Sequence, residues 1–187
     1  MVGLGNPGPD YEANRHNAGF MVLDAVVHGS SSVWDEAFGG RAATIRLEGH
    51  GVVLLEPFTF MNLSGRSVSA AMSALDIDLD RVLVVHDDLD LPLGTVRLKR
   101  GGGTGGHNGL KSVVAECGGP GFDRLRIGVG RPEEGSIVDW VLGDFSKSEG
   151  ALLDDVLQDA TRALSAVLVD GTSVAMVTVN ARAKTEI

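Results

Sequence analysis

The stretch that most constrains the fold is Arg81–His86, which carries the apolar run Val-Leu-Val-Val. A strand that is apolar at consecutive positions, and not only at alternate ones, has to be covered on both faces. The run therefore predicts a buried strand inside a sheet that lies between two other layers. The strand ends in His86-Asp87-Asp88, so it also delivers carboxylates to the edge of that sheet.

The rest of the chain alternates between strand and helix patterns. Further strands are predicted at 2–5, Arg41–Leu47, Val52–Glu56, Thr95–Arg100 (an exposed strand) and Leu125–Gly130, with a Glu-Gly-His-Gly hairpin turn between the second and third of these. Helical spacing predicts helices over Gly19–His28, from Ser64 to Leu75, and over Leu110–Glu116, Ser148–Val169 and Val174–Arg182. This order predicts an α/β fold: a single-domain three-layer sandwich over 1–187, with a twisted mixed β-sheet flanked by helices.

Composition excludes several classes of protein. The single cysteine, Cys117, forms no internal disulfide and no cysteine-based zinc cluster, which fits a reducing cytosol and predicts a cytoplasmic protein. No apolar run approaches the roughly 18 residues that span a bilayer, and the first residues lack the features of a signal peptide. We therefore expect no membrane association.

The net charge of −9 argues against nucleic acid as a partner for the molecule as a whole. Residues 97–131, however, hold seven basic residues against two acidic ones. A phosphate responds to the local field, so a basic patch and a merely solvated face both remain open.

Two glycine-rich segments suggest nucleotide or phosphate binding. Gly3–Gly8 matches G-x-G-x-x-G, but Pro7 stands where a helix should offer N–H groups, and Asp24 falls in a helical pattern; we reject a dinucleotide site. Gly101–Gly109 is either a phosphate cradle or a flexible hairpin exit. It is not a Walker A loop, because Leu110 separates Gly109 from lysine. Asn108 is a plausible N-cap for the helix that follows.

The polar residues around His16 and Asp87 are candidates for a functional site. His86-Asp87-Asp88-Leu89-Asp90 could hold a hard cation through carboxylates or orient a histidine, and no second ligand cluster supports the metal. Ser64 and Ser67 do not lie in G-x-S-x-G, and Cys117 fits a small core residue better than a nucleophile. We single out His16 as a candidate base, and the other polar residues make chemical sense as its helpers.

At this point the chain resembles a known family. The motifs follow one another in this order: Gly3-Leu4-Gly5-Asn6-Pro7-Gly8, Tyr11, Arg15-His16-Asn17, Phe60-Met61-Asn62-Leu63-Ser64-Gly65, His86-Asp87-Asp88-Leu89-Asp90-Leu91-Pro92, the run from Gly101 to Leu110, and the run from Phe122 to Pro132. Together they resemble the bacterial peptidyl-tRNA hydrolases over essentially the whole chain.

The resemblance implies metal-free and cofactor-free hydrolysis of the ester that joins a peptide to the 3′-terminal ribose of tRNA, by a cytoplasmic monomer. It implies that His16 is the general base, Asp87 its orienting carboxylate, and Asn6 and Asn62 contacts near the scissile ester, with Asn6 counted as catalytic. It further implies that Asn108 holds the peptide part and a water, and that the substrate pocket is lined by Tyr11, Met61 and His107. For the tRNA, it implies that Lys99 and Arg126 bind a phosphate. It also implies a lid at about 132–146.

The implied chemistry agrees with the residue types. Water and a histidine base can cleave an ester without a covalent nucleophile, and a neighbouring aspartate fixes the tautomer of that base. Amide side chains can donate hydrogen bonds to a developing oxyanion without adding charge.

Two alternatives stay open: an RNA-binding relative without turnover, like the family's chloroplast splicing factors, and a hydrolase of some other small ester. The retained polar set favours catalysis, and the lack of a transit segment argues against a plastid protein. The chain also departs from the family, because only Met1 precedes the first strand, which predicts incomplete pairing there. The last helix is rich in β-branched residues and the tail is less basic than expected, which puts tail–RNA contacts in doubt.

Overall fold

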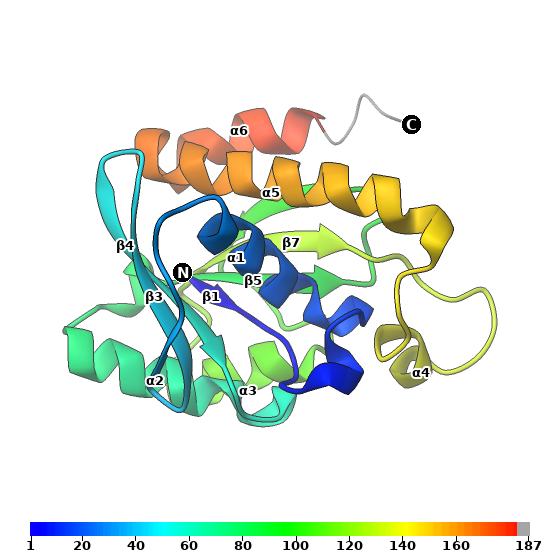
Figure 1. Ribbon diagram of the computed structural model, residues 1–187, viewed down its shortest axis with the longest axis horizontal. Coiled ribbons are helices and arrows are strands. Elements are labelled where there is room, and N and C mark those ends of the chain that lie inside the picture. Colours follow the sequence, from blue (N-terminus) through cyan, green and yellow to red (C-terminus); the bar gives the residue numbers. More distant parts are fainter. Residues whose placement is uncertain (183–187) are drawn as a thin grey trace.

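The molecule is built on one mixed seven-stranded sheet with helices on both sides (Figure 1). The structure, a computed structural model, describes residues 1–182; the remaining tail, and with it the question of tail–RNA contacts, lies outside the described residues. The strand order is β2-β3-β4-β1-β5-β7-β6. The strands are β1 Val2–Gly3, β2 Asp35–Ala37, β3 Gly40–Leu47, β4 His50–Pro57, β5 Leu83–Asp88, β6 Val96–Arg100 and β7 Asp123–Gly128. The helices are α1 Ala18–His28, α2 Ser64–Leu75, α3 Asn108–Glu116, α4 Ile137–Val141, α5 Gly150–Asp170 and α6 Thr172–Arg182.

Strand β5 is an inner strand of the sheet, as its apolar run predicts. It pairs in parallel with β1 on one side and with β7 on the other, and Val84 and Val85 are completely buried. Helices α1, α5 and α6 cover one face of the sheet, and α2 and α3 cover the opposite face (Figure 1). The predicted α/β sandwich with a mixed sheet is confirmed.

Strand β1 is short, as expected, but it pairs on both sides. Val2 lies opposite Leu55 of β4 and Val84 of β5, and the backbone N–H of Leu4 continues the ladder to the carbonyl of Val85 at 2.9 Å. The expectation of incomplete pairing is therefore wrong, because the residues flanking β1 extend its hydrogen bonds.

The outer strands differ more from the predictions. Strand β2 was not predicted, because Asp-Glu-Ala is short and polar; it is held at the edge by pairing with β3. The segment Thr95–Arg100 was predicted to be exposed, but Val96 and Leu98 of β6 lie in the core and only the strand's outer edge is unpaired in the sheet. The hairpin turn has two residues, Glu48 and Gly49, both with positive φ, as a tight primed turn requires, so His50 already belongs to β4.

Helix α1 approaches the sheet so closely that only glycine fits at its start. A Cβ atom at Gly19 would stand 2.4 Å from both the Leu4 nitrogen and the Val85 oxygen. This contact holds the turn before α1, which carries His16, at the carboxyl ends of β1 and β5. Among residues 1–182, no helix is long and apolar enough to cross a membrane.

Candidate active site

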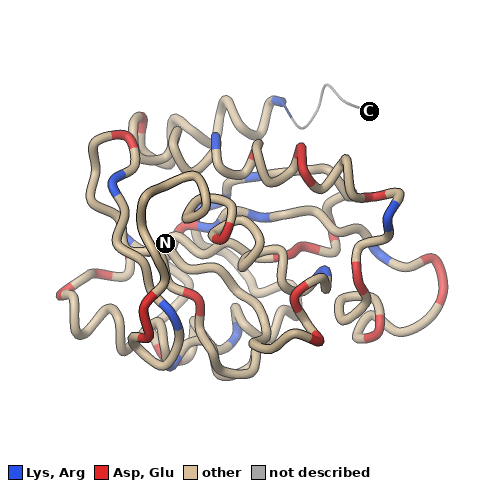
Figure 2. Tube along the Cα trace, viewed as in Figure 1, with Lys and Arg blue, Asp and Glu red and all other residues tan. Residues whose placement is uncertain are grey.

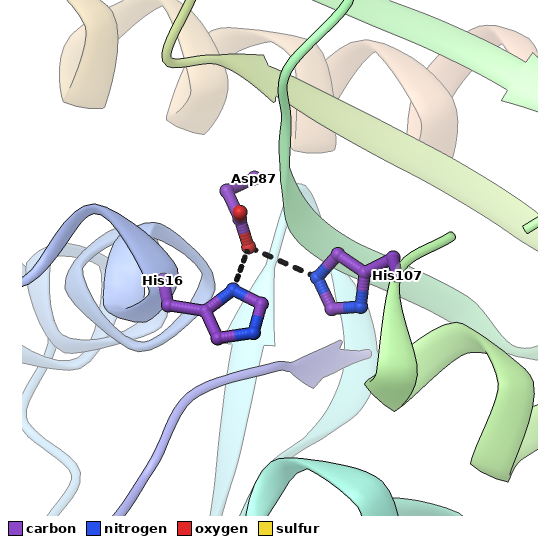
Figure 3. Close-up of side chains that lie close together, drawn as sticks. All are labelled: His16, Asp87 and His107. Atoms are coloured by element: carbon purple, nitrogen blue, oxygen red, sulfur yellow. Dashed lines mark hydrogen bonds and ion pairs between the residues drawn. The ribbon is translucent and has the colours of Figure 1, made fainter. Parts of the chain in front are cut away.

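His16 and Asp87 meet at the carboxyl end of β5. His16 lies in the 3₁₀ turn Arg15–Asn17, and its Nδ1 is 2.8 Å from Oδ1 of Asp87, near the end of the strand (Figure 3). The Asp87 side chain is 2% exposed and that of His16 is 12% exposed. The contact leaves Nε2 of His16 without a hydrogen-bond partner among the described residues, so this nitrogen is free to act on a bound molecule.

A second histidine reaches the same carboxylate oxygen. Nε2 of His107 lies 2.9 Å from Oδ1 of Asp87, and the rings of His16 and His107 have centroids 4.8 Å apart (Figure 3). Nδ1 of His107 accepts hydrogen bonds from the backbone N–H groups of Gly109 and Leu110. His107 is therefore the N-cap of α3.

The prediction that Asn108 caps this helix is wrong. Asn108 is the first helical residue, and its exposed side chain accepts a hydrogen bond from Nζ of Lys111 at 3.3 Å. The histidine ring takes the capping position because its Nδ1 faces the free backbone N–H groups.

The carboxylate of Asp87 stays charged although it is buried. Burial favours the neutral acid, but His107 and His16, which both donate to it, hold the pKa of Asp87 well below its usual range. Nearby, burial and the proximity of His107 lower the pKa of His86 to about 3, and Nδ1 of His86 donates to the Asp87 carbonyl at 2.7 Å. The end of β5 thus combines a fixed negative charge with a neutral histidine.

His16, Asp87 and His107 also have the side-chain types of a metal site, with ligand atoms within 4.8 Å of one another. Each histidine nitrogen that faces Asp87 stands at 2.8 or 2.9 Å from its oxygen, the separation of a direct hydrogen bond. A nitrogen that donates its proton in such a bond has no lone pair to offer an ion. The donor set fits an oriented base better than a metal centre.

A cavity of about 300 Å³ opens beside this cluster. Of the residues singled out from the sequence, His16, Asp87, His107 and Asn108 line it together. Ile137, Val138 and Val141 of α4 form an apolar wall on the side of the predicted lid. The cavity therefore offers a proton acceptor, an amide and an apolar surface.

Asn6 is held next to this site by two neighbours. Its Oδ1 accepts the backbone N–H of Met61 at 3.0 Å, which turns the amide so that Nδ2 is the group left to donate. Its backbone N–H and C=O both bond to the side chain of Asn17, each at 2.9 Å. Asn17 follows His16 directly, so it ties the turn of the histidine to the loop after β1. The sequence motif contained Asn17, but nothing in its spacing revealed this role.

Not all predicted residues join the His16–Asp87 cluster. Met61 is buried, and Asn62 beside it is exposed; Tyr11 is partly buried. None of these three side chains bonds to the cluster within the part of the chain that the structure describes. Asn6 itself lines a neighbouring cavity of about 320 Å³.

Lys99 and Arg126 lie on one face of the paired strands β6 and β7. Lys99 stands opposite Arg124, two positions from Arg126, so the two predicted residues are diagonal neighbours. The region is less basic than its sequence indicates. Nε of Arg126 bonds to Asp88 at 2.7 Å, and Arg124 turns inward to the carbonyl groups of Gly102 and Gly103. Basic and acidic positions are interspersed along the chain (Figure 2).

Arg15 connects the turn that carries His16 to the segment after α4. Its guanidinium is 4.0 Å from the ring centre of Trp140, donates to the Asp144 carbonyl and forms an ion pair with Glu149 at 2.9 Å. Asn14 adds a hydrogen bond to the Asp144 side chain at 2.6 Å. Sequence reasoning assigned Arg15 no role, because its partners lie far along the chain.

Comparison with known proteins identifies the same family as the motifs. Residues 1–186 match the family model described as peptidyl-tRNA hydrolase. The chain is 52% identical over 150 residues to a peptidyl-tRNA hydrolase of Geobacter sulfurreducens, covering 80% of this chain and 78% of that one. It is 48% identical over 183 residues to that of Geobacter sp. strain M21, covering 97% of each. The crystal structure of the Acinetobacter baumannii peptidyl-tRNA hydrolase superposes with a TM-score of 0.90 at 39% identity, over 96% of this chain and 93% of that one. The chain belongs to the peptidyl-tRNA hydrolase family.

Proposed function

We propose that His16 is the general base with which the protein hydrolyses the ester between a peptide and the 3′-terminal ribose of tRNA. The observation that carries this proposal is the 2.8 Å contact between Nδ1 of His16 and the Asp87 carboxylate. The contact places the ring proton on Nδ1 and leaves the Nε2 lone pair free beside the cavity.

In the first step, Nε2 takes a proton from a water molecule while the water oxygen attacks the carbonyl carbon of the ester. The carbonyl oxygen becomes an oxyanion, and the Asp87 carboxylate stabilises the imidazolium that forms. In the second step, the bond to the ribose oxygen breaks, and that oxygen takes the proton from His16. The products are a free peptide carboxyl group and a tRNA with a free terminal hydroxyl.

The remaining residues of the site have supporting roles in this proposal. Asn6, whose Nδ2 is the free end of its amide, and Asn62 donate to the ester region, where neutral donors stabilise developing charge. Asn108 holds the peptide part and the attacking water, and Tyr11, Met61 and His107 line the pocket. Asn108 and His107 both border the cavity beside His16, which supports their assignment.

Recognition of the tRNA body involves other parts of the chain. Lys99 and Arg126 hold a tRNA phosphate, supported by their placement on the same face of β6 and β7. Residues 132–146 act as a lid on a single domain of 1–187, supported by the apolar side chains that α4 turns toward the cavity. The protein works as a monomer in the cytoplasm, without a metal or other cofactor.

An assay of peptidyl-tRNA cleavage with and without EDTA tests this proposal. The account predicts release of free tRNA at the same rate in both conditions, because no step needs an ion. Binding of peptidyl-tRNA without cleavage would instead favour the RNA-binding relative. Cleavage that EDTA abolishes and added divalent metal restores would refute the metal-free mechanism.

A further inference from the structure

We infer that His107 is a positioning residue that holds the Asp87 carboxylate against His16, while the N-terminus of α3 holds His107. This inference rests on the proposed function of His16 as the base. It differs from a pocket-lining role, because both ring nitrogens of His107 are used by the protein and neither is left for the substrate.

The hydrogen bonds determine where the ring proton of His107 lies. Nδ1 faces the backbone N–H groups of Gly109 at 3.1 Å and Leu110 at 3.3 Å, which can only donate, so Nδ1 is an acceptor. The ring proton is therefore on Nε2, which donates to Asp87 at 2.9 Å. The ring cannot rotate without losing the helix cap or the carboxylate, and its side chain is only 8% exposed.

One carboxylate oxygen receives both histidine donors. Oδ1 of Asp87 lies 2.8 Å from Nδ1 of His16 and 2.9 Å from Nε2 of His107. Two donors from different elements fix the rotation of the carboxylate. The His107 donor also withdraws some negative charge from the oxygen that His16 uses. His107 therefore sets both the orientation of Asp87 and the strength with which Asp87 favours the protonated form of His16.

The two other carboxylates that line the cavity have partners of their own. His86 and Asp88 on β5, Asp90 in the loop after β5 and Arg131 after β7 complete the titratable and charged lining of the cavity, whereas α4 contributes only apolar side chains to it. Asp88 is paired with Arg126, and Asp90 with Arg131. A change at His107 therefore reaches His16 through the shared Asp87 oxygen and through the contact between the two rings, whose centroids are 4.8 Å apart.

The variant His107→Asn separates capping from positioning. Asparagine is a preferred N-cap, so the start of α3 is kept, but its side chain is too short to replace Nε2 at Asp87. We expect kcat to fall about tenfold, as for the loss of one hydrogen bond to a charged group. We expect KM for peptidyl-tRNA to stay close to the wild-type value. The acid limb of the pH–rate profile should move to higher pH, because Oδ1 then keeps more charge facing the imidazolium.

His107→Ala, which loses the cap as well, should move the limb in the same direction and also lower the melting temperature. An unmoved limb together with a wild-type kcat for a folded His107→Asn protein would overturn the inference. A raised KM with unchanged kcat would do the same, because it would make His107 a substrate contact. His16→Ala, measured in parallel, distinguishes failure of this inference from failure of the proposed function. Full activity of His16→Ala would refute His16 as the base, independently of the result for the His107 variants.

Discussion

At the residue scale, a charged carboxylate inside the protein gives His16 its proposed reactivity. Asp87 would be neutral if burial alone decided its state, but two histidine donors keep it ionised. An ionised Asp87 fixes the tautomer of His16 and stabilises its protonated form. The pair is therefore expected to respond to mutation through its electrostatics, without any change of fold.

Asp87→Asn tests this directly. The amide keeps the size and one hydrogen-bonding oxygen but removes the charge, so the imidazolium that forms on His16 loses the anion that stabilises it. We expect a fall in kcat of roughly 10²–10⁴-fold, the range over which general base catalysis contributes. The acid limb of the pH–rate profile should move to lower pH, opposite to the shift for His107→Asn. A limb that stays in place or moves upward would show that Asp87 does not act on His16 through its charge.

At the element scale, the site depends on contacts between segments that are distant in sequence. The turn Arg15–Asn17 is held by Gly19 against the sheet, by Asn17 against the loop after β1, and by Arg15 against residues 140–149. Arg15 is buried and its charge is balanced by Glu149. Removal of this side chain takes the cation away from Glu149 and one side-chain donor away from each of the Gly143 and Asp144 carbonyl groups.

Arg15→Met should therefore lower the free energy of unfolding by about 2 kcal/mol, because the partly buried carboxylate of Glu149 loses its cation and a charged hydrogen bond. The matched control is Arg162→Met, whose exposed pair with Asp159 lies on one helix and should contribute less than about 1 kcal/mol. Urea denaturation of both variants measures the difference. Equal losses would show that the Arg15 contacts do not stabilise this part of the fold.

Much of the element structure was predictable from the sequence, because strands and helices leave a periodic apolar pattern. The run in β5 predicted a strand covered on both faces, and the order of elements predicted a mixed sheet. Strand β2 has no such pattern and exists through its pairing with β3. The exposure of β6 was predicted wrongly. Its apolar residues Val96 and Leu98 alternate with charged residues, and the charged residues suggested a strand that faces solvent.

The sequence predicted which residues form the candidate site better than it predicted which of them contact one another. The motifs singled out His16 and Asp87, which the structure brings together. His107 was expected only to line the substrate pocket. Its bond to Asp87 was not predicted, because the spacing between the two residues does not encode a shared oxygen, and its role as N-cap was not predicted, because both histidine and asparagine can cap a helix. The partners of Arg15 lie 128 to 134 positions away, a distance at which local pattern carries no information.

At the scale of the whole molecule, an acidic protein has to bind an acidic substrate. The net charge is −9, so a tRNA phosphate needs a local concentration of positive charge. The face of β6 and β7 that carries Lys99 and Arg126 is our proposal for that place. Because Arg126 is already paired with Asp88, we expect Lys99 to give the clearer result.

Lys99→Ala and Arg126→Ala should raise KM for full-length peptidyl-tRNA and flatten its salt dependence, because fewer counterions are released on binding. Both should hydrolyse a short peptidyl-oligonucleotide that lacks the phosphate about as well as the wild type. Arg46→Ala, an exposed arginine on the β3–β4 hairpin, is the control and should leave both substrates unaffected. Equal losses on the long and short substrates would rule out a phosphate clamp.

The central claim is that His16 is the base, and His16→Ala measured with saturating peptidyl-tRNA tests it most directly. The account predicts that kcat falls by roughly 10²–10⁴-fold while KM changes little, because the base acts in the transition state. The exposed histidine His28, replaced by alanine, should leave kcat unchanged. A folded His16→Ala protein that keeps a near wild-type kcat would contradict the account.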